Sequence, residues 1–110
     1  MAEKHDFLYL VGYNSREYSD LAKLLDILGA QSGSNSIGVV LIQDGVIGLS
    51  KKGRAPAFLS DLMKLSLKVY AMVPDLKARG IQKIIDGVDG IEYGDLVDLM
   101  VDSTKVVSWL

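Results

Sequence analysis

The sequence lacks cysteine altogether and has one histidine and two prolines among its 110 residues. Without a thiol, the chain cannot form a disulfide, a thiolate metal site or a cysteine nucleophile, and it cannot carry sulfur as a persulfide. A single histidine likewise excludes a His-rich metal centre. Chemistry of these kinds must take place on another molecule, and we expect neither a metal nor a cofactor on this chain.

Long apolar runs are also missing. No stretch approaches the roughly 18 consecutive apolar residues of a membrane span. The first six residues carry charges of both signs, and the short apolar run at 7–11 has no small-residue cleavage site behind it, so we expect no secretory signal. We therefore expect a cytoplasmic protein.

The charge balance is slightly acidic. Twelve Lys and Arg oppose fourteen Asp and Glu, for a net charge of −2. A dedicated nucleic-acid binder would have a broad basic surface, which this composition does not predict. Lys51, Lys52 and Arg54 form a local basic cluster. A solvated loop is its simpler interpretation, and contact with RNA or an acidic partner is the alternative.

The pattern of apolar residues predicts an α/β fold. The hydrophobic share of 49% predicts a filled core, and the length fits one domain over residues 1–110. Runs rich in Val, Ile and Leu are typical of strands buried on both faces. They span residues 7–11, 37–42, 67–73, 88–91 and 105–109. We predict three layers, with a mainly parallel, roughly five-stranded sheet and helices on both faces. The pattern leaves the strand order open.

Helical spacing occurs between these strands. The first helix is predicted to bury Tyr18, Leu21, Leu25 and Leu28 and to stop at Gly29. A short helix is predicted from Pro74 to Arg79 and Gly80, followed by a further helical turn at 81–86. The last helix is predicted to bury Tyr93, Leu96, Val97 and Met100.

Polar residues follow several of the predicted strands. They include Gln43, Asp44 and Gly45 after the second strand, Asp75 after the third, and Glu92, Tyr93 and Asp95 after the fourth. Open parallel sheets bind ligands at this carboxyl edge. Turn and helix-cap roles are the simpler interpretation, because helix starts favour Asp and Asp-Gly favours turns.

No catalytic motif is evident. The glycine-rich loops that bind phosphates or dinucleotides are absent. A phospho-accepting receiver domain would need an acidic pair after the first strand, where Gly12 and Tyr13 stand, so Asp44 is a weak candidate for modification. His5 precedes the first strand, and we expect it to lie in a solvated terminus. Trp109 is either an interface anchor or a core residue.

Three segments together resemble the DsrH/TusB family of sulfur-relay proteins. They are residues 41–46 (LIQDGV), 68–80 (KVYAMVPDLKARG) and 91–99 (IEYGDLVDL), joined by the closing 108–110 (SWL). The similarity runs from about residue 37 to the end, and the order and spacing of the segments carry it. The resemblance implies a DsrE-like α/β fold.

The resemblance also implies partners. Family members assemble with DsrE/TusD-like and DsrF/TusC-like paralogues. The TusBCD type passes persulfide sulfur toward 2-thiolation of the tRNA wobble uridine, and the DsrEFH type serves sulfur oxidation. DsrH-type members can carry a cysteine in the first helix, where this chain has residues 20–25 (DLAKLL). Because a sulfane sulfur must be held by a thiolate, the chain resembles the TusB type, a non-catalytic subunit with an indirect link to tRNA.

The resemblance gives a role to the matched residues. They are expected to shape a subunit interface or the approach to a partner's cysteine, or else to keep turns and caps in place. The candidate set is Gln43, Asp44, Gly45, Asp75, Arg79, Glu92, Tyr93, Asp95 and Trp109. The alternative is a self-associating homodimer that binds a small ligand near Tyr13, Asp44 and Tyr93.

Overall fold

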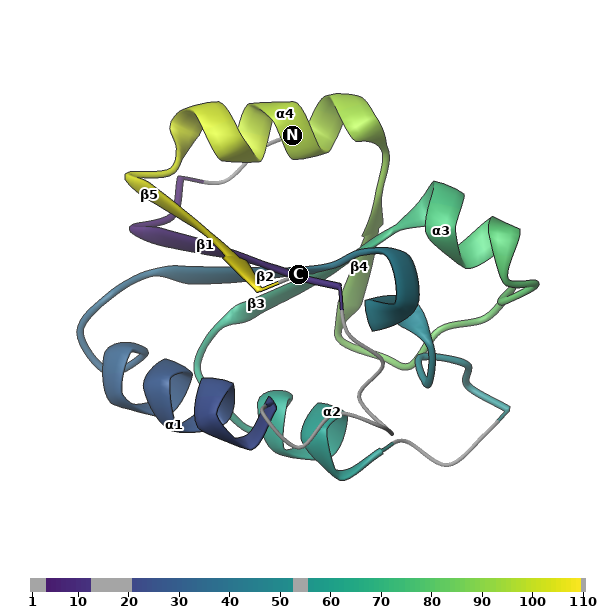
Figure 1. Ribbon diagram of the computed structural model, residues 1–110, viewed down its shortest axis with the longest axis horizontal. Coiled ribbons are helices and arrows are strands. Elements are labelled where there is room, and N and C mark those ends of the chain that lie inside the picture. The colour runs from purple at the N-terminus through teal and green to yellow at the C-terminus, as the bar shows by residue number, and fades with distance from the viewer. Residues whose placement is uncertain (1–3, 13–20, 53–55, 110) are drawn as a thin grey trace.

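The computed structural model describes residues 4–12, 21–52 and 56–109. Its centre is a five-stranded sheet with the strand order β4-β3-β2-β1-β5, and every neighbouring pair is parallel (Figure 1). The strands are β1 (Phe7–Val11), β2 (Ile37–Leu41), β3 (Lys68–Met72), β4 (Val88–Ile91) and β5 (Lys105–Trp109). The predicted α/β class and parallel sheet are confirmed.

Helices cover both faces of this sheet. Helices α1 (Leu21–Gln31) and α2 (Ala57–Leu62) lie on one face and enclose the larger core, and α4 (Tyr93–Asp102) lies on the other (Figure 1). The side chains of β1 and β2 alternate between the two cores, which explains why both strands are apolar throughout. No helix among the described residues is long and apolar enough to cross a membrane.

Helix α1 continues beyond the predicted stop. Gly29 lies inside it, and the helix ends two residues later at Gln31. Its buried side chains are Leu21, Leu24 and Leu28, whereas Leu25 is only half-buried. Tyr18 lies outside the described residues. The prediction of Gly29 as a stop was wrong because Ser32 and Asn35 continue to hydrogen-bond backwards onto the last turn.

The segment after the third strand was predicted only in part. Helix α3 (Val73–Ala78) has Pro74 in its first turn and ends at Arg79, as expected. The further helical turn at 81–86 is not formed. Instead Lys51 N–H donates to the carbonyl of Lys83 at 2.8 Å, and Ile85 N–H donates to that of Leu49 at 3.0 Å. This antiparallel pairing keeps the segment extended.

Tyr9 connects β1 to the end of α1. Its hydroxyl donates a hydrogen bond of 2.6 Å to Oε1 of Gln31. Burial raises the pKa of the Tyr9 phenol above its usual value, and the hydrogen bond to Gln31 opposes that rise. The phenol therefore stays protonated and keeps donating at neutral pH.

His5 is buried, against expectation, with 2% of its surface exposed. Its Nδ1 lies 2.9 Å from Oγ of Ser36, and its Nε2 lies 2.8 Å from the hydroxyl of Tyr70. A Cβ at Gly38 would come within 2.7 Å of the His5 ring, so glycine in β2 makes room for the imidazole. The expectation of a solvated terminus was wrong because β1 lies inside the sheet, and its preceding residue is covered.

We predict that His5→Ala lowers the free energy of unfolding by about 2 kcal/mol, because it removes two side-chain hydrogen bonds and leaves a cavity under Gly38. Urea denaturation measures this change. Lys4→Ala is the matched control: Lys4 is adjacent and exposed, so its effect should stay within about 0.5 kcal/mol. Equal effects of the two substitutions would contradict a structural role for the imidazole.

Candidate functional site

The parallel sheet brings the ends of its strands to one edge, and the candidate residues lie along that edge. Residues 43–45 follow β2, Asp75 follows β3, the group Glu92 to Asp95 follows β4, and Trp109 ends β5. Their order along the edge is the strand order. Residues after β2 and β3 are therefore neighbours, whereas Trp109 stands at the far side from Glu92.

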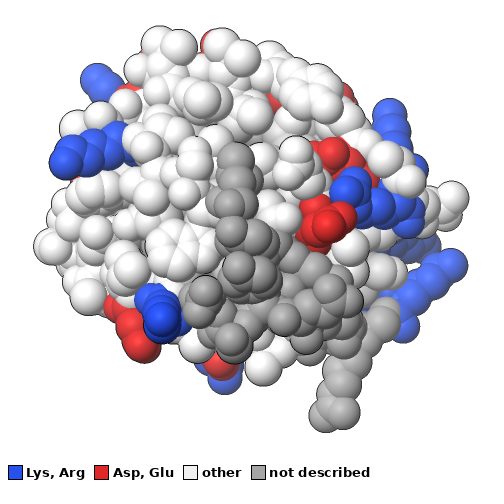
Figure 2. All heavy atoms as spheres, in the orientation of Figure 1, with Lys and Arg blue, Asp and Glu red and all other residues white. Residues whose placement is uncertain are grey.

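Arg79, Asp44 and Asp75 form a cluster at this edge. Arg79 Nη2 lies 2.9 Å from Asp44 Oδ1, and Nη1 lies 3.8 Å from Asp75 Oδ1. Asp75 Oδ2 also accepts a hydrogen bond of 2.9 Å from the backbone N–H of Gln43. Figure 2 shows these opposite charges side by side over the region of η1 (Gln43–Val46) and α3. The cluster ties the turn after β2 to the helix after β3.

The turn itself is tightly constrained. Gln43 has a positive φ of 51°, an unusual value for a residue with a side chain. A Cβ on Gly45 would lie 2.2 Å from the carbonyl oxygen of Val11 at the end of β1. Only glycine fits there, because the obstructing atom belongs to the backbone of the central strand. The Gln-Asp-Gly motif therefore has a definite structural role.

Glu92 and Asp95 form the start of α4. The Glu92 N–H donates to Asp95 Oδ2 at 3.0 Å, and the two side chains form a capping box. This arrangement satisfies backbone donors that a helix start leaves open. Tyr93 between them points away from the protein and is exposed. Two of these three residues thus act as caps.

Trp109 is separate from these groups. It is half-buried at the end of β5 and packs against the larger core, and its carbonyl accepts a hydrogen bond of 3.1 Å from Gly12 N–H. The indole therefore extends the core at the open edge of the sheet. This position favours the core interpretation over an exposed anchor.

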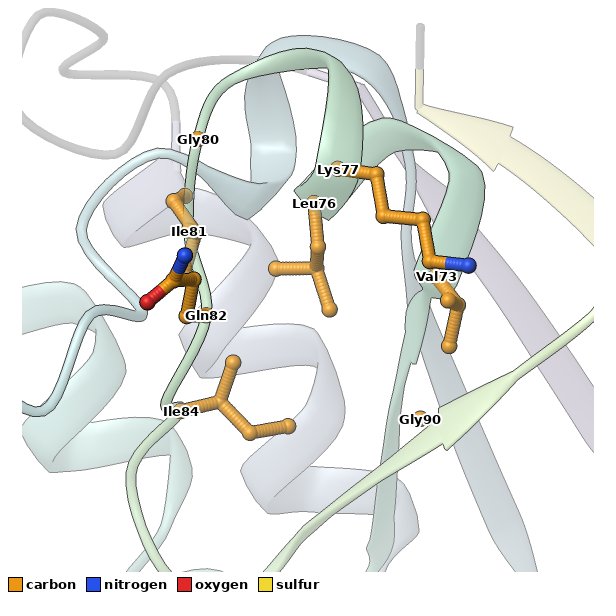
Figure 3. A pocket seen from close by; sticks show the side chains of 8 residues that line it. All are labelled: Val73, Leu76, Lys77, Gly80, Ile81, Gln82, Ile84 and Gly90. Atoms are coloured by element: carbon orange, nitrogen blue, oxygen red, sulfur yellow. The ribbon is translucent and has the colours of Figure 1, made fainter.

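The carboxyl edge offers little chemistry of its own. The described residues hold no group of three potential metal ligands, and the Asp44 carboxylate is engaged by Arg79. A cavity of about 490 Å³ lies elsewhere, beside α3 and β4, and neither Asp44 nor Tyr93 lines it (Figure 3). Tyr13, the third member of the expected ligand crevice, lies outside the described residues.

The last helix presents an apolar stripe that the sequence prediction assigned to the core. Leu99 is buried and Leu96 half-buried under α4, whereas four apolar residues face outward. These are Tyr93, Val97, Met100 and Val101, exposed by 62%, 55%, 40% and 76%. We call these four residues the α4 stripe. The prediction was wrong because α4 has apolar residues on two sides, and spacing alone does not say which side meets the sheet.

The fold places the chain among three-layer α/β proteins with a parallel five-stranded sheet. It is similar to the crystal structure of the YchN protein from E. coli, with a TM-score of 0.75 and 20% identity over 94% of this chain and 97% of that one. A protein of unknown function from Methanobacterium thermoautotrophicum has a TM-score of 0.61 and 21% identity, over 90% and 95% of the two chains. At such identities the likeness concerns the fold.

Sequence comparison is more specific. Residues 15–106 match the family described as DsrH like protein. The chain is 35% identical over 92 residues to Protein TusB of Escherichia fergusonii, covering 83% of this chain and 88% of that relative. Protein TusB of Shigella flexneri is 34% identical over the same shares. The chain belongs to the DsrH-like family.

We predict that Gly45→Ala destabilises the protein by about 3 kcal/mol or more, because its methyl group must displace the backbone of β1. Thermal or urea unfolding measures the loss. Gly94→Ala is the matched control, since nothing lies within 4 Å of its added Cβ. In the first turn of α4 that change should be neutral or stabilising by up to about 1 kcal/mol. A tolerated Gly45→Ala would rule out the close approach to Val11.

For Trp109→Ala we expect a loss of about 2 kcal/mol in unfolding free energy, roughly half the cost at a fully buried aromatic site. Ser108→Ala, at the exposed preceding position, should have little effect. Denaturation curves report this stability, and sizing of the assembled protein gives a second measurement. Weakened assembly with unchanged stability would instead identify Trp109 as an interface anchor.

Proposed function

We propose that this chain is a non-catalytic subunit of a cytoplasmic sulfur-relay complex that supports 2-thiolation of the tRNA wobble uridine. Membership of the DsrH-like family and similarity to proteins named TusB support this role. The chain has no cysteine, so a partner must hold the sulfur. Sulfur oxidation, the other process in which the family takes part, is the alternative pathway. The link to tRNA is indirect.

The observation that carries this proposal is the α4 stripe. Its four apolar residues recur at helical spacing on the outer side of the helix that covers the smaller core. Val106 of β5 adds a further exposed apolar side chain on the same face of the sheet, because it alternates with Val107, which packs on the larger core. Contiguous exposed apolar surface of this kind is typical of protein–protein interfaces.

The stripe has the makeup of an interface centre. Tyr93 is the type of residue that dominates binding energy at such sites, and Met100 adapts to irregular partner surfaces. Asp98 and Asp102 are exposed on the same helix and provide a polar rim. A stable complex would bury about 1,600 Å² in total, so the stripe forms the centre of a larger contact.

The proposed partners are DsrE/TusD-like and DsrF/TusC-like paralogues. In this arrangement the cysteine-bearing subunit performs the thiol exchange, and this chain holds it in place through α4. The Asp44–Arg79–Asp75 cluster keeps the carboxyl edge rigid beside such a partner. A homodimer formed through the same stripe is the competing arrangement.

We predict that Val97→Asp combined with Val101→Asp weakens assembly with a cysteine-bearing DsrE-like partner at least about tenfold, because two carboxylates would be buried in an apolar contact. The measurement is a pull-down from native extract with the full chain as bait, followed by mass spectrometry. Both positions are exposed, so the melting temperature should change by less than about 2 °C.

Ile27→Asp is the matched control. Ile27 is 39% exposed on α1, on the opposite face of the sheet, and its substitution should leave assembly intact. Recovery of a DsrE-like partner by the native chain and the control, with loss in the double variant, is the expected result. Recovery of the bait alone, as a dimer on a sizing column, would contradict the sulfur-relay assignment.

A further inference from the structure

The cavity beside α3 has an apolar interior. Its volume is about 490 Å³, and it lies between α3, the extended segment at 80–84 and the edge strand β4. Figure 3 shows the side chains of Leu76 and Ile84 pointing into it from opposite walls. Val73 and Ile81 add further apolar surface. The cavity therefore fits an aliphatic or aromatic group rather than a hydrated one.

Gly90 keeps the cavity open on the side of the sheet. A Cβ at this position would lie 3.0 Å from Cγ2 of Val73, so any side chain there would occupy the space. Gly90 alternates with Ile91, which packs in the smaller core under α4. The cavity is consequently on the α3 side of the sheet, on the face opposite the α4 stripe.

The mouth of the cavity is positively charged. Lys77 lines it, and Lys83 lies between two further lining residues; within the described part of the chain neither lysine has an ion pair. The nearby carboxylates are engaged elsewhere. Asp75 lies near Arg79, Asp86 is 3.2 Å from Lys51, and Asp89 is 3.1 Å from Lys68 on the other face.

The edge strand beside the cavity favours a polypeptide over a small molecule. In the described sheet β4 has a strand neighbour only on the β3 side. Its outer backbone groups can therefore pair with an added extended segment. Alternate side chains of such a segment would point toward the cavity, at the spacing that an extended chain provides.

We propose that this cavity docks an extended acidic segment of a partner protein. One apolar side chain of the segment inserts between Leu76 and Ile84, and flanking carboxylates pair with Lys77 and Lys83. This site is distinct from the α4 stripe and goes beyond the proposed subunit role. The two faces of the sheet can bind different partners at the same time.

A titration of the isotope-labelled full chain with a short synthetic peptide tests the proposal by NMR. The peptide is capped at both ends and carries one leucine flanked on each side by two glutamates. We expect shifts confined to the amides of residues 73–84 and 88–91. A peptide with lysine for glutamate, or glycine for leucine, should bind at least about tenfold more weakly, and added salt should weaken the acidic peptide.

Variants locate the contact on the protein. Lys77→Glu combined with Lys83→Glu should weaken the acidic peptide at least about tenfold, because both ion pairs become repulsive. Lys64→Glu with Lys105→Glu is the matched control, as it changes the net charge equally away from the cavity. Ile84→Ala keeps the charges and should also weaken binding. Spectra of the free variants verify that each is folded.

Several results would overturn the proposal. These are the absence of shifts at millimolar peptide, equal binding of the lysine peptide, shifts centred on α4, and equal effects of the two charge-reversal variants. Equivalent shifts produced by inorganic phosphate would indicate a simple anion site and would also overturn it. The titration needs no other subunit, so its outcome is independent of whether the chain assembles through α4.

Discussion

Hydrogen bonding of β1 to two parallel neighbours, β2 and β5, determines where the other elements lie. The chain begins in the interior of the sheet and builds outward through β2 and β3 to β4. To place β5 beside β1, it must then return across the whole sheet, and α4 makes that crossing (Figure 1). Burial of His5 and the need for glycine at position 45 follow from the same constraint, because both residues lie against the central strands.

The two faces of the sheet differ in how completely they are covered. Helices α1 and α2 pack together over the larger core and leave little apolar surface outside. On the other face α4 covers the smaller core and carries apolar residues on its outer side as well. A helix that is apolar on two sides needs two partners, and the sheet supplies one of them. Assembly with another subunit provides the second in the role proposed for this chain.

The conserved character of a turn and the character of a site are hard to separate in a sequence. Gln43, Asp44, Asp75 and Arg79 are separated by up to 36 positions, yet they meet in one cluster because β2 and β3 are adjacent and parallel. Glu92 and Asp95 have a local role, so their spacing alone correctly indicated a helix cap. The cavity at α3 had no counterpart in the sequence analysis, since its walls come from three elements and its floor is a glycine.

The sequence by itself determined the α/β class, the five strands and the absence of a thiol, because runs of apolar residues and composition are local properties. It also determined the resemblance to the DsrH/TusB family, through motifs in a fixed order. Only the tertiary structure decided the strand order, the burial of His5 and the outward direction of Tyr93, Val97 and Met100. Those features depend on which residues meet across the sheet, and helical spacing gives the apolar positions of α4 without saying which of them face the core.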